Sequence, residues 1–443
     1  MRLPPWALVG LSLTWAGTAG AAGGELSLAD LYDASRLHDP TIQSATYAYQ
    51  ASQNEEAIGR GRLLPQVSLG SRYGKGGRTD GGTDASYVDS DDYQSNSVSL
   101  TAQQPLYDKA RWAAYQEGKA RGQLGELEFD VASQTLFERV AKAYFQVARV
   151  ENEIKLIGQQ KAAIAGLVEQ NKRLFASGEG TVTDIDDAQA RYDLVVAQEV
   201  EAQTQRIAAL RTLSGRANIA VQDIPPMQER SLGEGLLAPE HDLGYWTRIA
   251  RDASPELAAR QAAVRVAEAQ SEGQKAGHYP TLSLTGQLTR RDNSQYQELQ
   301  PRQDSYYVGL SLDIPLYSGG SVSASVKKAE AALAGAQADY DVQRQQLAED
   351  VETDYLGVVA GQAKSRAMLR AVDSNQKALT STEKGYQGGV RSTVDILDAQ
   401  QRLFQARRDL LNTKLDMLLS YVTLHTHTGQ MNRAVLERLQ GMF

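Results

Sequence analysis

The sequence contains no cysteine among its 443 residues. This absence excludes disulfide bonds, thiolate-bound metals, cysteine catalysis and lipid attachment through an N-terminal cysteine. Basic residues are fewer than acidic ones: the sequence has 46 lysines and arginines and 54 aspartates and glutamates, which gives a formal net charge of −8. A general nucleic-acid-binding protein is therefore disfavoured, since such proteins neutralise phosphate with basic surfaces.

Long apolar runs are missing as well, and the one short run lies at the N-terminus. Residues 1–22 combine one arginine, an apolar stretch and a small-residue end, "MRLPPWALVGLSLTWAGTAGAA". This pattern is typical of a secretory signal peptide, and the stretch is too short to span a bilayer comfortably. We expect an exported protein without a transmembrane helix, located in the periplasm, outside the cell or as a β-barrel in an outer membrane.

Proline is absent from two long tracts. All 12 prolines lie at or before Pro315, and none falls between Pro105 and Pro225. Proline is poorly tolerated inside helices, and both tracts are rich in good helix formers. The sequence predicts helices over about 111–176, 181–214, 321–387 and 392–428, the longer ones on the order of 100 Å. Such lengths suit a tube or a coiled coil.

Short strand candidates precede each helical tract. The sequence predicts strands at 67–73, 97–103, 281–289 and 307–317, with polar loops at 74–96 and 290–305. In the last strand Val308, Leu310 and Leu312 share one face, whereas Gly309 and Ser311 share the other. One apolar and one polar face with a period of two is the pattern of a membrane β-strand. Tyr107 and Tyr317 are expected to close equivalent strands, and this matched placement favours a position at a bilayer interface over ordinary core packing.

The two halves repeat one another. Each contains a strand, a loop, a strand, "PLY", a long helix, a glycine-rich turn and a second helix. We assign residues 23–215 and 246–429 to two repeats, 216–245 to a linker and 430–443 to a C-terminal segment. The last helix has apolar residues every seven positions, which indicates supercoiling: Ile396, Leu403, Leu410, Met417 and Leu424. The matching row of the first half, from Ile185, is less regular.

The strand count implies an oligomer. One chain supplies four membrane strands, whereas bacterial barrels need at least about eight, and an open sheet in lipid leaves edge groups unpaired. Two, three or four copies would give 8, 12 or 16 strands, and the residues do not choose among these. A secreted structural coiled-coil protein without a pore is the alternative from a different functional class.

Two aspartates at the start of the last helix, Asp395 and Asp398, share one helix face. A near-copy in the first half contains Asp184. The patterns "STVD" and "TVTD" match a capping box, which is the default reading of Asp184 and Asp395. Asp398 lies one turn beyond the cap. In an assembly around an axis, the pair would form a carboxylate ring that favours cations and helps to gate a pore.

The combination of these motifs resembles the TolC family of outer-membrane export channels. The similarity rests on "LLPQVSLG" with "HYPTLSLT", the two "PLY" segments, "FASGEGTVTDIDDAQAR" and "GYQGGVRSTVDILDAQ". It implies a mixed α/β membrane protein, a homotrimer with a 12-stranded barrel in outer-membrane lipid and a 12-helix periplasmic tunnel. Without a cysteine after the signal peptide, the lipid-anchored branch of the family is not matched.

The resemblance also implies roles for the tips of the helices. Asp395 and Asp398 correspond to entrance carboxylates, and Asp184 to an aspartate held by a tyrosine and an arginine, here Tyr386 and Arg391. Four glycines mark the turns where a periplasmic adaptor protein and an inner-membrane pump, driven by ATP or by protons, are expected to engage: Gly178, Gly180, Gly388 and Gly389.

Motifs for catalysis are not found in the sequence. There is no phosphate-binding loop, nucleophile elbow or zinc motif, and the five histidines are mostly scattered. His425 and His427 are two residues apart, which on a helix directs them to different sides. We therefore expect a transport protein that is not an enzyme, with no cofactor and no metal site, whose energy comes from a partner.

Overall fold

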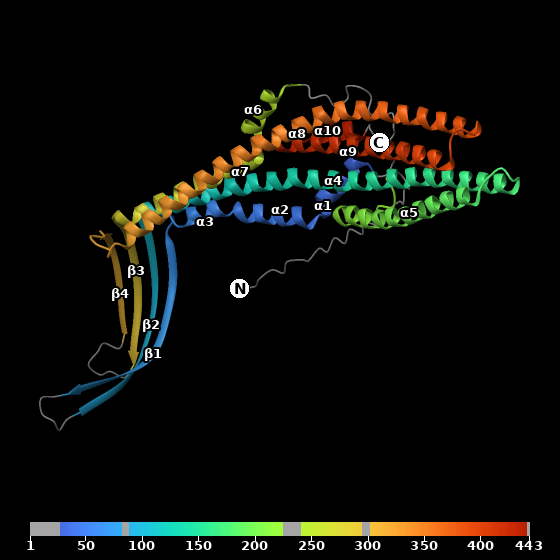
Figure 1. Cartoon of the computed structure of the whole chain (residues 1–443). Coiled ribbons are helices and arrows are strands. Elements are labelled where there is room, and N and C mark those ends of the chain that lie inside the picture. Colours follow the sequence, from blue (N-terminus) through green and yellow to red (C-terminus); the bar gives the residue numbers. More distant parts are fainter. Residues whose placement is uncertain (1–26, 82–87, 225–240, 295–301, 441–443) are drawn as a thin grey trace, which may run out of the picture.

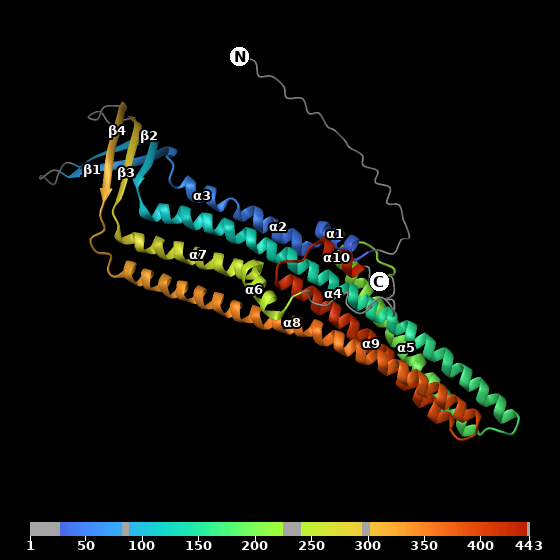
Figure 2. The same ribbon diagram turned by 90° about the horizontal axis from the view of Figure 1, so that it is seen from above.

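The computed structural model describes residues 27–81, 88–224, 241–294 and 302–440. The molecule is elongated, with a four-stranded sheet at one end and long helices running away from it (Figures 1 and 2). The predicted signal peptide and most of the predicted linker lie outside the described residues. None of the helices in the described ranges is long and apolar enough to cross a membrane.

Four helices dominate the body and match the predicted tracts within a few residues. They are α4 (Lys109–Ala176), α5 (Val182–Ala217), α8 (Ser321–Gln387) and α9 (Thr393–His427). The 68 residues of α4 correspond to a length on the order of 100 Å. Asp108 is the N-cap of this helix, and its carboxylate accepts a hydrogen bond from the backbone N–H of Arg111 at 3.1 Å.

Shorter helices flank these four. Three belong to the first half of the sequence and three to the second: α1 (Leu28–His38), α2 (Pro40–Ser52), α3 (Glu55–Gly61), α6 (Leu243–Ala253), α7 (Pro255–Lys275) and α10 (Arg433–Gln440), with a 3-10 turn at Ala276–His278. Helices α2 and α3 pack on α4, while α7 lies between α4 and α8 (Figure 2). In the first half, the two short helices α2 and α3 therefore occupy the position that the single helix α7 occupies in the second half.

The sheet has the order β1-β2-β3-β4 and is antiparallel throughout. Its strands are β1 (Gln66–Gly81), β2 (Val88–Tyr107), β3 (Thr281–Ser294) and β4 (Arg302–Asp313). Each repeat supplies one hairpin, and β2 pairs with β3 across the two halves. Consequently β1 and β4 are edge strands, whose outer backbone groups face no neighbour within the described sheet.

The prediction that segments 74–96 and 290–305 are loops is wrong in part, because strand pairing continues into both segments. Strands β1 and β2 continue through much of segment 74–96, with Gly74 opposite Ser95 and Asp80 opposite Asp89. Strands β3 and β4 likewise extend into segment 290–305. Backbone pairing needs no apolar side chains, so a polar hairpin stays in register beyond the apolar band. The expectation that Tyr317 closes a strand is also wrong, since β4 ends at Asp313, whereas Tyr107 does end β2.

Cross-strand register confirms that the sheet has one apolar and one polar face. Leu69 lies opposite Leu100, which lies opposite Leu288, and directly paired residues point to the same side. The face of Leu100 also carries the following apolar side chains: Val67, Val98, Leu282, Leu284, Tyr306, Val308, Leu310 and Leu312. The other face carries mainly Ser, Thr, Gln and Gly. Several apolar side chains are largely exposed, with Val308 at 72%.

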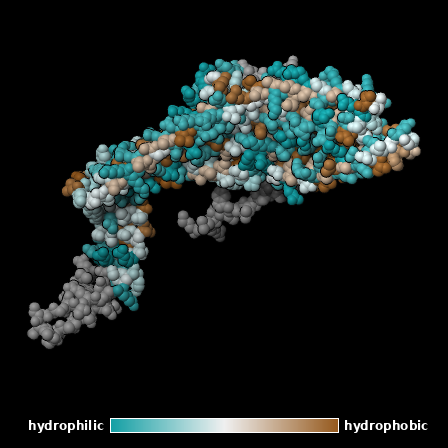
Figure 3. All heavy atoms as spheres, in the orientation of Figure 1, coloured by the Kyte–Doolittle hydropathy of each residue, from teal (hydrophilic) through white to brown (hydrophobic). Residues whose placement is uncertain are grey.

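The helical body has a thin, segmented core rather than one globular centre, and its outer surface is largely hydrophilic on the face shown in Figure 3. The predicted seven-residue row of α9, from Ile396 to Leu424, is buried at every position. Its counterpart in α5, from Ile185 to Arg206, is only partly buried. Within the single chain, the row in α9 is therefore better buried than its counterpart in α5.

Candidate functional site

Two helical hairpins end side by side at the extremity opposite the sheet. One is formed by α4 and α5, and the other by α8 and α9 (Figures 1 and 2). An apolar cluster joins all four helices near these tips, including Ile164 of α4, Ala188 of α5, Leu379 of α8 and Leu397 of α9. The two hairpins therefore form one packed unit.

Glycines shape both turns in the same way. Gly178 and Gly389 have positive φ angles of 81° and 72°, a conformation that disfavours residues with a Cβ atom. The N–H of Gly180 donates to the carbonyl of Leu174, as the N–H of Val390 does to that of Gly385. These bonds satisfy carbonyls at the helix ends. Gly388 has an ordinary φ of −84°, whereas a Cβ atom at Gly180 would lie 2.9 Å from the backbone nitrogen of Phe175. The two turns therefore require glycine at Gly178, Gly180 and Gly389.

The second helix of each hairpin, α5 or α9, begins with a capping box, as the sequence predicts. The backbone N–H of Asp184 donates to the hydroxyl of Thr181 at 3.1 Å, and that of Asp395 to the hydroxyl of Ser392 at 3.2 Å. Each aspartate in turn accepts from the hydroxyl and backbone N–H of its partner. Asp184 and Asp395 thus serve as caps, whatever further role they have.

Hydrogen bonds hold the pKa of both capping carboxyls below the usual range. For Asp184 the hydroxyl of Thr181 is the main cause, with Thr393 of the other hairpin adding to it against the effect of burial. For Asp395 the backbone N–H and the hydroxyl of Ser392 dominate, and Arg391 contributes by its charge. Both groups are therefore ionised at neutral pH.

Tyr386 lies on α8 close to the first hairpin, but it reaches Asp184 through an intermediary. Its hydroxyl donates to the side-chain oxygen of Asn171 at 3.1 Å. The amide nitrogen of Asn171 donates to the backbone carbonyl of Asp184 at 2.9 Å. Asn171 is buried, with 1% of its surface exposed, and sequence reasoning missed it.

Arg391 faces its own helix in the single chain. Its Nη1 lies 3.6 Å from Oδ1 of Asp395, one turn along. The structure thus places Tyr386, Asp184 and Arg391 at the same end of the molecule. Tyr386 is linked to Asp184 through Asn171, whereas Arg391 pairs with Asp395 of its own hairpin.

Asp398 has a cationic partner that the sequence reading did not identify. Nη2 of Arg191, on α5, donates to Oδ1 of Asp398 at 3.1 Å, and Nη1 donates to the side-chain oxygen of Gln401 at 2.7 Å. The side chains of Arg191 and Asp398 are 39% and 44% exposed. The signal available in the sequence was the basic residue of "DAQAR", which follows the first-half aspartates by about two helical turns.

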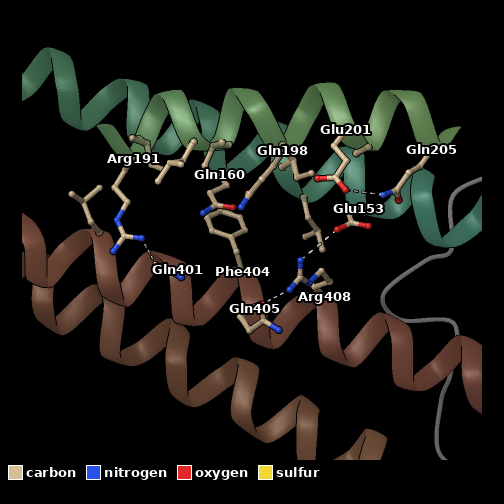
Figure 4. Close-up of a pocket in the computed structure, with 17 residues that line it drawn as sticks. Glu153, Gln160, Arg191, Gln198, Glu201, Gln205, Gln401, Phe404, Gln405 and Arg408 are labelled. Carbon is tan, nitrogen blue, oxygen red and sulfur yellow. Dashed lines mark hydrogen bonds and ion pairs between the residues drawn. The ribbon is translucent and has the colours of Figure 1, made fainter. Parts of the chain in front are cut away.

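A groove runs between the two hairpins above this ion pair, with a volume of about 420 Å³. Figure 4 shows Arg191, Gln198 and Gln205 of α5 facing Gln401, Phe404 and Arg408 of α9 across it. Arg408 also pairs with Glu153 of α4 at 3.4 Å. Glutamines and paired charges make the groove polar.

Metal-binding clusters of three or more His, Asp or Glu side chains do not occur in the described ranges. His427 instead contacts Asp354 of α8 at 2.9 Å, and buried His425 contacts the backbone carbonyl of Tyr421. Both histidines thus have structural partners.

The fold defines an elongated protein built from two strand–helix–turn–helix units, with a membrane-type sheet at one end and a paired-hairpin tip at the other. The chain belongs to the outer membrane efflux protein family, whose model matches residues 31–217 and 246–430. It is an outer-membrane protein, and this membership agrees with the expectation of a transport protein rather than an enzyme.

Relatives of the chain are found over almost its whole length. It is 31% identical to the alkaline protease secretion protein AprF of Pseudomonas aeruginosa, covering 94% of this chain and 87% of that protein. It is 29% identical to the proteases secretion protein PrtF of Dickeya chrysanthemi, covering 96% and 93%. The outer membrane protein TolC of Vibrio cholerae is 28% identical, covering 94% and 93%.

Solved structures share the fold at lower sequence identity. The outer-membrane channel OprN has a TM-score of 0.80 and 17% identity, covering 91% of this chain and 90% of that one. The outer membrane protein VceC of Vibrio cholerae has a TM-score of 0.78 and 18% identity, covering 91% and 97%. The resemblance inferred from the motifs is thus confirmed at the level of family and fold.

Proposed function

We propose that this protein is the exit duct of a tripartite export system, carrying cargo from an inner-membrane transporter across the periplasm and the outer membrane. The observation that carries the proposal is the joining of an exposed apolar sheet face to helices on the order of 100 Å long. The sheet suits lipid, and the helices suit a tunnel.

The working form is proposed to be a homotrimer. A four-stranded sheet leaves the outer backbone groups of β1 and β4 without partners in lipid, which is costly. Three copies would close these edges into a 12-stranded barrel, and the four major helices of each copy would give a 12-helix tunnel. In this assembly the apolar sheet face contacts outer-membrane lipid and the polar face lines the channel. Repeats spanning 23–215 and 246–429 would each supply half of a protomer.

The proposed cargo is protein, exported by type I secretion with a periplasmic adaptor and an inner-membrane ABC transporter. Two relatives with 29% and 31% identity, PrtF and AprF, are protease secretion proteins. Efflux of small molecules with a proton-driven transporter is the second candidate, favoured by the description of the family as efflux proteins. Both use the same duct and differ in their partners.

The tips of the hairpins are proposed as the gated periplasmic entrance. Asp395 and Asp398 would line the mouth as a cation-attracting ring, and Asp184, Tyr386 and Arg391 would restrain the closed state. The turns at Gly178, Gly180, Gly388 and Gly389 would contact the adaptor. In support, all nine residues lie at the extremity farthest from the sheet, where a partner from the inner membrane would arrive.

Site-specific cross-linking in cells tests the proposed partners. A photoreactive residue at Glu179 or Val390, beside the two turns, is expected to capture an adaptor together with an ABC transporter. Capture of a proton-driven pump would instead support efflux. A probe at Tyr47, exposed on α2 far from the tips, serves as the control. If the tip probes captured no adaptor while export continued, the docking assignment would be wrong.

The alternative, a secreted coiled-coil protein without a pore, predicts a different sheet. A cap that stays in water has no need for Val67, Leu69, Val308 and Leu310 to be more than half exposed on one face. Recovery of the protein in a soluble extracellular fraction, with none in outer membranes, would favour this alternative.

A further inference from the structure

The ion pair between Arg191 and Asp398 changes the charge expected at the proposed entrance. A ring made of Asp395 and Asp398 alone would present six carboxylates in a trimer. In the folded chain each carboxylate has a guanidinium beside it. Arg391 lies 3.6 Å from Asp395, and Arg191 lies 3.1 Å from Asp398. Two positive charges therefore offset two negative charges per chain.

The two arginines reach their partners differently. Arg391 precedes Asp395 by one turn and belongs to the same hairpin. Arg191 belongs to the other hairpin and binds α9 twice, through Asp398 and Gln401, with one nitrogen for each side chain. It thus spans the seam between α5 and α9, as Figure 4 shows for its contact with Gln401.

In the described ranges, three arginines form ion pairs that join the two hairpins, and Arg191 is the one nearest the tips. The other two are Arg408, which pairs with Glu153, and Arg149, which pairs with Asp416 at 2.6 Å. Those pairs connect α9 to α4 farther up the helices. Because Arg191 sits nine residues after the start of α5, its charge lies at the level of the carboxylates that the proposed function assigns to the entrance.

We propose that Arg191 is a selectivity-setting residue of the entrance, which neutralises Asp398 within each protomer and ties the two hairpins together at their tips. This inference rests on the proposed function, because it presumes that Asp398 faces the permeation path. Both side chains are half-exposed, so the pair adds little stability. Its effect is on ions, since a paired carboxylate attracts passing cations far less than a free one.

The test is planar-bilayer recording on four forms of the full-length protein: wild type, Arg191→Gln, Asp398→Asn and the double variant. Arg191→Gln frees three carboxylates per trimer, so cation preference should rise and the half-blocking concentration of Mg²⁺ should fall by roughly threefold to tenfold. Asp398→Asn should do the opposite. The double variant should return to near the wild-type value, because both partners are removed.

Two further variants separate charge from structure. Arg191→Lys keeps the positive charge but loses the two-nitrogen contact, so its selectivity should stay near that of wild type. Arg211→Gln makes the same charge change at an exposed position of α5, twenty residues farther from the tip, and should leave block by Mg²⁺ unchanged. If Arg191→Gln and Arg211→Gln behaved alike, the loss of overall charge would explain the result and the proposal would be overturned.

The recordings separate the role of Arg191 from the function of the whole protein as an exit duct. If wild type formed no channels at all, the exit-duct proposal would fall. If Asp398→Asn changed selectivity while Arg191→Gln did not, the entrance would stand and the role of Arg191 would be rejected. If wild type conducted but neither variant differed from it, the carboxylate ring itself would be misplaced and this inference would fall with it.

Discussion

The hydroxyl of Tyr386 donates a hydrogen bond to the side-chain oxygen of Asn171, 3.1 Å away on the other helical hairpin. Asn171 is almost fully buried, and its side-chain nitrogen donates a second hydrogen bond to the backbone carbonyl of Asp184. The chain of two hydrogen bonds links α8 to the start of α5. The two tips are therefore joined by directional contacts as well as by their shared apolar cluster.

Removing the tyrosine hydroxyl should loosen the tips. Tyr386→Phe deletes one hydrogen bond, worth about 0.5–1.5 kcal/mol, and leaves the buried oxygen of Asn171 without its donor. Combined with Arg391→Ser, it should raise single-channel conductance and the frequency of opening in planar bilayers. Tyr355→Phe, at a partly buried tyrosine of α8 farther from the tip, is the matched control. Identical conductance in the double variant and wild type would place the restraint elsewhere.

Neutralising both entrance aspartates should weaken cation preference. Asp395→Asn with Asp398→Asn removes two negative charges per chain, six in the proposed trimer, while keeping side-chain volume, and it frees Arg191 and Arg391 to repel cations. The reversal potential in a KCl gradient should move toward that of an anion-preferring pore, and block by divalent or trivalent cations should diminish. Asp409→Asn with Asp416→Asn, two carboxylates higher on α9, provides the comparison. An equal shift in that variant would argue against a localised ring.

The N-caps Thr181 and Ser392 should stabilise the first turns of α5 and α9. Thr181→Ala and Ser392→Ala each remove a cap hydroxyl, at a cost of about 1 kcal/mol to the helix start. Amide hydrogen exchange should accelerate over the first turns of α5 or α9 in the corresponding variant, and the rest of the helix should keep its protection. Thr181→Ser should preserve the slow exchange, because the hydroxyl remains. Unchanged exchange in Thr181→Ala would mean that the cap is not stabilising.

The contact between His427 and Asp354 should make the α8–α9 seam depend on pH. Burial alone would lower the pKa of His427, but the hydrogen bond and charge of Asp354, with Asp350 and Glu256 nearby, raise it above 6.5. A raised histidine pKa means that the stabilisation is fully present below about pH 6.5 and is lost as pH rises through the higher pKa of the folded state.

Hydrogen exchange along this seam should therefore be slower at pH 5.5 than at pH 8.5, after correction for intrinsic rates. His427→Gln should abolish the difference. His278→Gln, in the short turn before β3, is the matched control. A pH dependence that survived in His427→Gln would assign the effect to other groups.

The apolar face of the sheet should be required for membrane insertion. Arginine in place of Leu100, which belongs to that face, should cost about 2–4 kcal/mol if it reaches the bilayer midplane. Ser99→Arg places the same residue on the opposite face one position away and should be tolerated. Recovery of folded, heat-resistant oligomer from vesicles measures both. Equal losses in the two variants would contradict the assignment of faces.

Much of the fold follows from the sequence for physical reasons that act locally. Proline-free tracts bounded by capping motifs gave the four major helices to within a few residues, because a helix ends where its backbone can no longer continue. The alternation around Leu310 gave the face of the sheet that carries apolar residues. The seven-residue row of α9 identified the buried seam, since that period keeps one stripe against its neighbours.

The contacts at the tip were less accessible to sequence reasoning. The sequence predicts a carboxylate pair that includes Asp398, but its partner Arg191 lies in the other hairpin, and no local spacing connects the two. Asn171 likewise joins Tyr386 to Asp184 from a third helix. Such pairings depend on how two hairpins dock, which is set by the apolar cluster beneath them rather than by any one motif. The strand lengths were missed because backbone pairing continues where side chains are polar.

The proposed exit duct is tested by single-channel recording of the purified protein in a planar bilayer. A trimeric exit duct should give discrete conducting events, with cation preference raised by Arg191→Gln and lowered by Asp398→Asn. A correctly folded oligomer that inserts into the bilayer and never conducts, in wild type or in the Tyr386→Phe, Arg391→Ser variant, would contradict it.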